Sequence, residues 1–73
     1  MQLGRDELDR RLAALDEAMV MLRAEYPDHE ELRAAFSSAA GSILAVAGTD
    51  RNHVAGRLHA ILIANGLDEP HRL

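Results

Sequence analysis

The middle of the chain contains a long stretch without a formal charge. Residues 34–49 read AAFSSAAGSILAVAGT, which is 16 residues between Arg33 and Asp50. A membrane-spanning helix needs about 20 predominantly apolar residues, and the serines dilute this stretch further. The stretch therefore predicts a buried helix of a soluble fold, covered on more than one side by other parts of the protein.

The length of the chain limits what can cover that helix. With 73 residues, the protein is one domain near the lower size at which a single hydrophobic core supports folding. It has no cysteine, which excludes disulfides and thiolate zinc sites. Self-association is therefore expected. The first residues are charged where a secretory signal would be apolar, so we expect a cytoplasmic protein.

The first helix is predicted over residues 6–25, because apolar side chains there alternate at spacings of four and three residues. They form one stripe of Leu8, Leu12, Leu15, Met19, Leu22 and Tyr26. Pro27 disfavours helical geometry at Tyr26 and ends the segment. Asp28 is the expected N-cap of the next helix, with Glu31 three residues later as in a capping box.

Two further helices complete the predicted fold. Residues 29–47 repeat the helical spacing with Leu32, Phe36, Ala39, Ile43 and Val46, and residues 50–65 do so with Val54, Leu58, Ile61 and Leu62. Gly48 suits the position after a helix end, Thr49 or Asp50 can cap the third helix, and Asn65-Gly66 is a stop signal after which Leu67 folds back. Short connections favour an all-α, up-down-up three-helix bundle. We expect one domain over residues 1–67 and a frayed tail over residues 68–73.

The outer sides of the second and third helices are small or apolar where solvent-facing helices normally carry charge. Gly41 within a helix costs about 1 kcal/mol relative to Ala, which suggests close approach of another helix. We expect a symmetric homodimer packed through these positions. The predicted dimer or partner interface consists of Ala34, Gly41, Leu44, Ala45, Gly56, Ala60 and Ile63.

The charge of the chain points to the kind of partner. Residues 1–31 hold four Arg against nine acids, a net charge of −5, whereas residues 32–67 hold three Arg against Asp50, a net charge of +2. Asp9, Asp16 and Glu17 lie off the apolar stripe of the first helix. We therefore expect an acidic protein-protein interaction module, such as an adaptor, a chaperone-like protein or a neutralising protein, whose protein partner is basic.

Catalytic and metal chemistry are not expected from this sequence. No two of the four histidines have the spacing of three or four residues that places two ligands on one helix face. The sequence also lacks a nucleophile motif and a glycine-rich phosphate loop. We therefore predict no enzyme activity, no metal and no cofactor.

One segment suggests an alternative function. Residues 48–58, GTDRNHVAGRL, contain Gly48, Arg51, Asn52, Val54, Arg57 and Leu58. This arrangement resembles the turn and recognition helix of helix-turn-helix proteins of the Fis and NtrC type. The resemblance implies a DNA-binding regulator in which Arg51, Asn52 and His53 contact base edges. Arg57 would then contact a phosphate.

Other features of the sequence count against nucleic acid as the partner. Leu44 stands four residues before the turn glycine, where such motifs place a small residue. The predicted preceding helix is also longer than in the motif, and the chain is acidic, whereas duplex binding depends on Lys and Arg. The interaction module is therefore the preferred hypothesis, and the helix-turn-helix regulator is its alternative.

Overall fold

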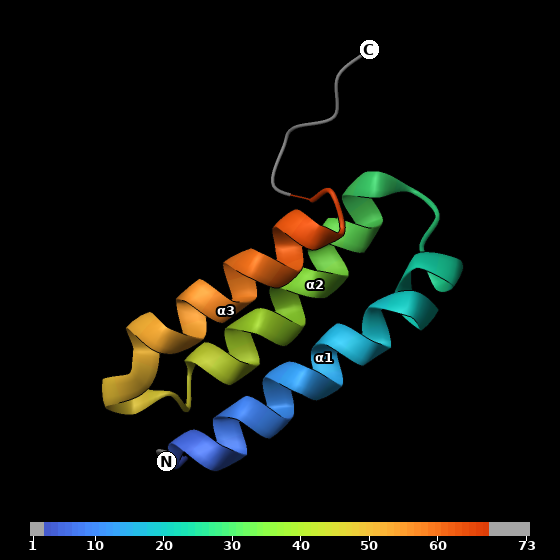
Figure 1. The fold of residues 1–73 in the computed structure, drawn as a ribbon. Coiled ribbons are helices and arrows are strands. Elements are labelled where there is room, and N and C mark those ends of the chain that lie inside the picture. Colours follow the sequence, from blue (N-terminus) through green and yellow to red (C-terminus); the bar gives the residue numbers. More distant parts are fainter. Residues whose placement is uncertain (1–2, 68–73) are drawn as a thin grey trace.

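A computed structural model describes residues 3–67, which form three α-helices packed against one another (Figure 1). Helix α1 is Arg5–Glu25, α2 is His29–Leu44 and α3 is Arg51–Ala64, and one short 3₁₀ helix, η1 (Gly48–Asp50), precedes α3. The helices run up, down and up, and no strand occurs within the described range. The predicted all-α three-helix bundle is confirmed. The predicted tail, residues 68–73, lies outside the described residues.

The apolar stripes predicted from the sequence form the core. Leu8, Leu12 and Met19 of α1 are almost completely buried, and Leu22 and Tyr26 pack against the core while partly exposed. The remaining buried side chains come from all three helices and the segments after α2 and α3: Leu15, Leu32, Phe36, Ala40, Ile43, Ala47, Val54, Leu58, Ile61 and Leu67. Since α2 packs on both α1 and α3, its inner side is covered by the chain itself.

The connection between α1 and α2 has the predicted N-cap at Asp28, but the Glu31 side chain makes no reciprocal hydrogen bond to the Asp28 amide, so the capping box is incomplete. Asp28 has an extended backbone, and its Oδ1 accepts hydrogen bonds from the amides of Glu30 (2.9 Å) and Glu31 (3.2 Å). These bonds satisfy two of the amides that the first turn of a helix leaves unpaired. The reversal of the chain after Pro27 therefore has a local cause.

The end of α2 differs from the prediction. The helix ends at Leu44, not near residue 47, and the amides of Val46 and Ala47 turn back to the carbonyl oxygens of Ile43 and Leu44 (3.2 Å each). The amide of Leu3 donates to the Val46 carbonyl oxygen (2.9 Å), and Ala47 is fully buried. Residues 45–47 thus form a tighter turn than an α-helix, in which Val46 binds the N-terminal segment and Ala47 packs into the core.

The start of α3 also corrects one expectation. Gly48 adopts the predicted left-handed backbone with φ +58°. The side chain of Asp50 makes no capping hydrogen bond, and its Oδ1 lies 3.6 Å from Arg5 Nε. The turn of η1 leads directly into α3.

Helix α3 stops at the predicted Asn65-Gly66 pair, and its end forms a Schellman motif. Gly66 has φ +70°, its amide donates to the Ile63 carbonyl oxygen (3.0 Å), and the Leu67 amide donates to that of Leu62 (2.9 Å). The fold-back buries the Leu67 side chain completely. The left-handed backbone of Gly66 therefore allows Leu67, which follows the helix, to reach the core.

We predict that Gly66→Ala lowers the free energy of unfolding by about 1 kcal/mol or more, because an L-residue with a Cβ is strained in the left-handed region. Gly66→Asn is the matched control and should lose less, since Asn adopts this conformation more readily. Urea unfolding of the three proteins measures the difference. Equal stability of the Ala variant and the original protein would show that the turn does not need this backbone.

Candidate functional site

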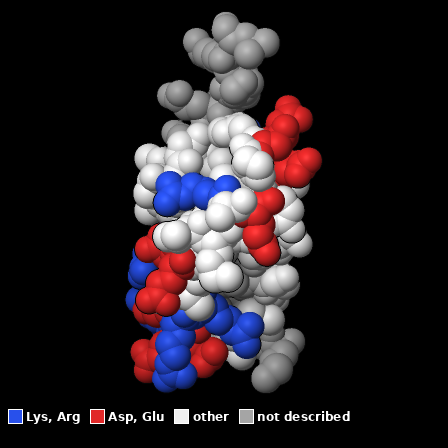
Figure 2. Space-filling model, turned by 90° about the vertical axis from the view of Figure 1, so that its right-hand side faces the viewer, with Lys and Arg blue, Asp and Glu red and all other residues white. Residues whose placement is uncertain are grey.

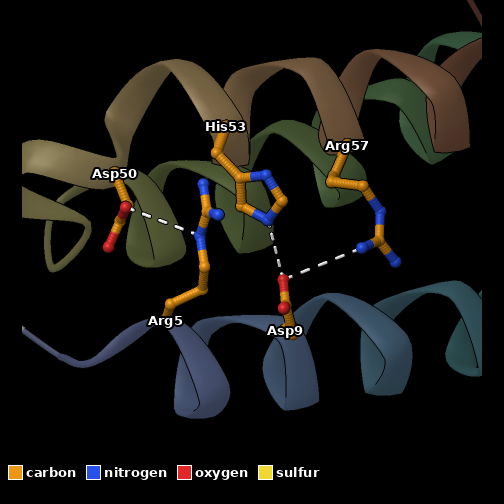
Figure 3. A network of polar contacts seen from close by, with 5 residues as sticks. All are labelled: Arg5, Asp9, Asp50, His53 and Arg57. Carbon is orange, nitrogen blue, oxygen red and sulfur yellow. Dashed lines mark hydrogen bonds and ion pairs between the residues drawn. The ribbon is translucent and has the colours of Figure 1, made fainter.

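A network of polar side chains joins α1 to the start of α3 (Figure 3). Asp9 Oδ1 lies 2.8 Å from His53 Nε2 and 3.7 Å from Arg57 Nη1, while Arg5 pairs with Asp50. Arg5 and Asp9 are one turn apart on α1, and His53 and Arg57 are one turn apart on α3, so each pair projects from one side of its helix. We call these five residues the Asp9 network.

The electrostatics of the Asp9 network favour an ionised carboxylate. The hydrogen bond from His53 lowers the pKa of Asp9 below its ordinary value, and the nearby charges of His53, Arg57 and Arg5 act in the same direction. Partial desolvation opposes them. Because the Asp9 side chain remains 40% exposed, water screens these interactions, and each adds little to the stability of the fold.

The Asp9 network reduces the number of predicted DNA-binding side chains that are available to contact DNA. Arg51 and Asn52 are exposed, but His53 and Arg57 face the carboxylate of α1. The four residues therefore do not form one free basic surface. Helix α3 packs against both α1 and α2, and Figure 1 shows it alongside α2. DNA binding through this helix stays a prediction.

The network also alters the expected acidic surface of α1. The sequence suggested that Asp9, together with Asp16 and Glu17, faces a partner protein. Asp9 instead pairs within the chain, whereas Asp16 and Glu17 are exposed. Helical spacing indicates that Asp9 lies beside the apolar stripe. Only the packing of α3 on α1 shows that its partners are His53 and Arg57.

The predicted interface residues lie mostly on the outside of the bundle. Ala34 and Gly41 of α2 are exposed, as is Ala45, which directly follows the helix, and Leu44 is half-buried. On α3, Gly56, Ala60 and Ile63 are exposed, with Ile63 at 49%. A Cβ added to Gly41 would have no neighbouring atom within 4 Å, so no other helix of this chain approaches it closely. We call these seven residues the small-residue surface.

A second exposed apolar site was not predicted from the sequence. Val20 and Met21 of α1 are 65% and 69% exposed and are, with Ile63, the large apolar side chains most open to solvent within residues 3–67. Val20 and Met21 lie outside the apolar stripe of α1 that includes Met19 and Leu22. Their position off this stripe was the feature of the sequence that could have predicted their exposure. Figure 2 shows the side of the molecule formed by α1 and the α1–α2 connection, with an uncharged area between groups of charged side chains.

Residues 3–67 contain no pocket and no cluster of three potential metal ligands, and none of their helices is long and apolar enough to cross a membrane. Comparisons with protein-family models, curated proteins and solved structures find no match. The function is therefore inferred from the surface of the bundle.

We predict that Asp9→Asn lowers the free energy of unfolding at neutral pH and weakens its dependence on pH in acid. The lowered pKa of Asp9 in the folded protein gives stability that is present above the unfolded-state pKa and is lost as the pH falls through the folded-state pKa. Urea unfolding from about pH 7 down to about pH 2 covers this window.

The matched control is Asp16→Asn, which removes a carboxylate of the same helix that faces solvent. This variant should keep the acid-dependent loss of stability that Asp9 produces. An Asp9→Asn protein with the same pH profile as the original would show that the contacts to His53 and Arg57 do not act in solution.

Proposed function

We propose that this protein is a small protein-protein interaction module that acts as a homodimer through its small-residue surface. The observation that carries the proposal is the exposure of Ile63 on α3, next in helical register to Gly56 and Ala60, where a solvent-facing helix normally carries charge. The exposed Ala34 and Gly41 of α2, together with Ala45 directly after it, give a comparable surface.

The size of the fold makes association energetically important. A bundle of 73 residues buries a small core, and domains of this size have marginal stability. Burial of apolar surface contributes about 25 cal/mol per Å², so an interface that removes a few hundred Å² of it adds several kcal/mol. A second copy would therefore supply a large share of the stability of the folded state.

Gly41 supports a close helix contact with another chain. Glycine within a helix costs about 1 kcal/mol relative to alanine, and within its own chain the Cβ position of Gly41 is open. The fold of the single chain therefore gives no steric reason for glycine at this position. Close approach of a helix from a second copy would give one, because backbones come nearest where side chains are smallest.

We predict a dimer in solution, with a mass by light scattering of about twice the 8.0 kDa of the chain. Ile63→Glu should shift the mass toward that of the monomer, because it would place a carboxylate in the apolar interface. Ala14→Glu is the matched control, since it adds the same charge at an exposed position of α1 outside the small-residue surface. A monomer at high micromolar concentration would refute the proposed homodimer.

A smaller change tests the contact at Gly41. Gly41→Ala should raise the free energy of unfolding of the dilute chain by about 0.5–1 kcal/mol, because Ala favours the helix. It should also weaken dimerisation, since the added methyl group separates the two backbones. Sedimentation equilibrium and urea unfolding of the same samples separate the two effects. Unchanged dimerisation would place Gly41 outside any close contact.

A further inference from the structure

The C-terminal half of α1 exposes two large apolar side chains that the fold does not use. Val20 and Met21 project from the bundle at 65% and 69% exposure. Ala13, Glu17 and Ala24 lie in helical register with Val20, at separations of seven, three and four residues, and all three are exposed. We call Ala13, Glu17, Val20, Met21 and Ala24 the α1 surface.

The carboxylates of α1 divide into two groups. In the N-terminal half, Glu7 pairs with Arg10 (3.0 Å) and Arg11 (3.5 Å), and Asp9 belongs to the network with α3. In the C-terminal half, Asp16, Glu17 and Glu25 are exposed, and no ion pair within residues 3–67 includes them. Asp6 is also unpaired, but it lies in the first turn of α1, where the positive end of the helix dipole favours a carboxylate. Beyond the first turn, the unpaired carboxylates of α1 are those that surround Val20 and Met21.

Local helix stability does not explain these unpaired acids. Glu25 is the last residue of α1, where the negative end of the helix dipole disfavours a carboxylate. Residues 14–25 hold these three acids and a single base, Arg23. The negative charge in this half of the helix lowers its stability unless positive charge from outside the chain approaches it.

We infer that the α1 surface binds an amphipathic helix of a basic partner protein. The partner would place apolar side chains on Val20 and Met21 and Lys or Arg side chains over Asp16, Glu17 and Glu25. Met21 suits this role because its flexible, polarisable side chain adapts to different apolar surfaces. The inference rests on the proposed function as an interaction module, but it uses a surface separate from the proposed dimer interface.

Charge decides between such a partner and a second copy of this chain. A two-fold contact centred on Val20 and Met21 would bring the acids of two α1 helices together, and like charges destabilise such a contact. With a basic helix, the Lys or Arg side chains of the partner attract these acids, and Val20 and Met21 are buried as they would be against a second copy. The contact extends over about three helical turns, so it belongs to the small and transient class of interfaces.

The test uses a labelled peptide of about 15 residues with Leu at helical spacing and Lys at the flanking positions, and fluorescence anisotropy at low salt measures its binding. An acidic twin, with Glu in place of each Lys, has the same apolar stripe. The basic peptide should bind, the acidic twin should not, and added salt should weaken binding. Equal binding of both peptides, or of neither, would overturn the inference.

Variants of the full chain locate the binding surface. The double change Val20→Ser with Met21→Ser should weaken peptide binding by about tenfold or more. The control Ala55→Ser with Ala64→Ser, at exposed positions of α3 outside both named surfaces, should leave binding unchanged. Glu17→Gln with Glu25→Gln should weaken binding and its salt dependence, whereas Glu7→Gln should not, because Glu7 is already paired within α1.

Light scattering of the same variants separates this inference from the proposed homodimer. The Val20→Ser, Met21→Ser protein should keep the mass of the original protein. If that variant dissociates a dimer, the α1 surface binds a second copy and the inference is wrong. If the original chain is a monomer that still binds the basic peptide at α1, the inference holds and only the homodimer is refuted.

Discussion

The packing of the apolar stripe of α1 against the other two helices is the interaction on which the remaining structure depends. Leu8, Leu12 and Met19 lose nearly all contact with water, and the core they form also includes side chains of α2, α3 and the segments that follow them. Each helix in isolation would leave an apolar stripe exposed, and short isolated helices are marginal in water. Because this core occupies one side of each helix, the opposite sides remain as surface, and their composition determines what the bundle can bind.

The sequence predicted the features that local rules control. The spacing of apolar residues on α1, the cap at Asp28 and the stop at Gly66 each follow from a few neighbouring residues, and all three are confirmed. The end of α2 at Leu44 was not predicted, because it depends on a hydrogen bond from Leu3 and on burial of Ala47. The Asp9 contacts were also missed, since they depend on how α3 packs on α1, which periodicity within one helix does not specify.

The surfaces of the bundle differ in chemistry, and this difference supports two kinds of proposed contact. The small-residue surface has little charge and an exposed Ile63, which suits packing against an identical helix face. The α1 surface combines Val20 and Met21 with unpaired acids, which suits a basic partner and disfavours self-contact. Between α1 and α3, the carboxylate of Asp9 lies beside His53 and Arg57, and its negative charge disfavours the approach of a DNA phosphate to this part of α3.

The central claim is that a small core and exposed apolar faces make this protein depend on association. Thermal unfolding across a wide range of protein concentration tests it most directly, because association that favours the folded state makes the midpoint depend on concentration. The account predicts a midpoint that rises as the total chain concentration increases from low micromolar to near millimolar. A midpoint that stays constant over this range, with a fully folded chain at the lowest concentration, would contradict it.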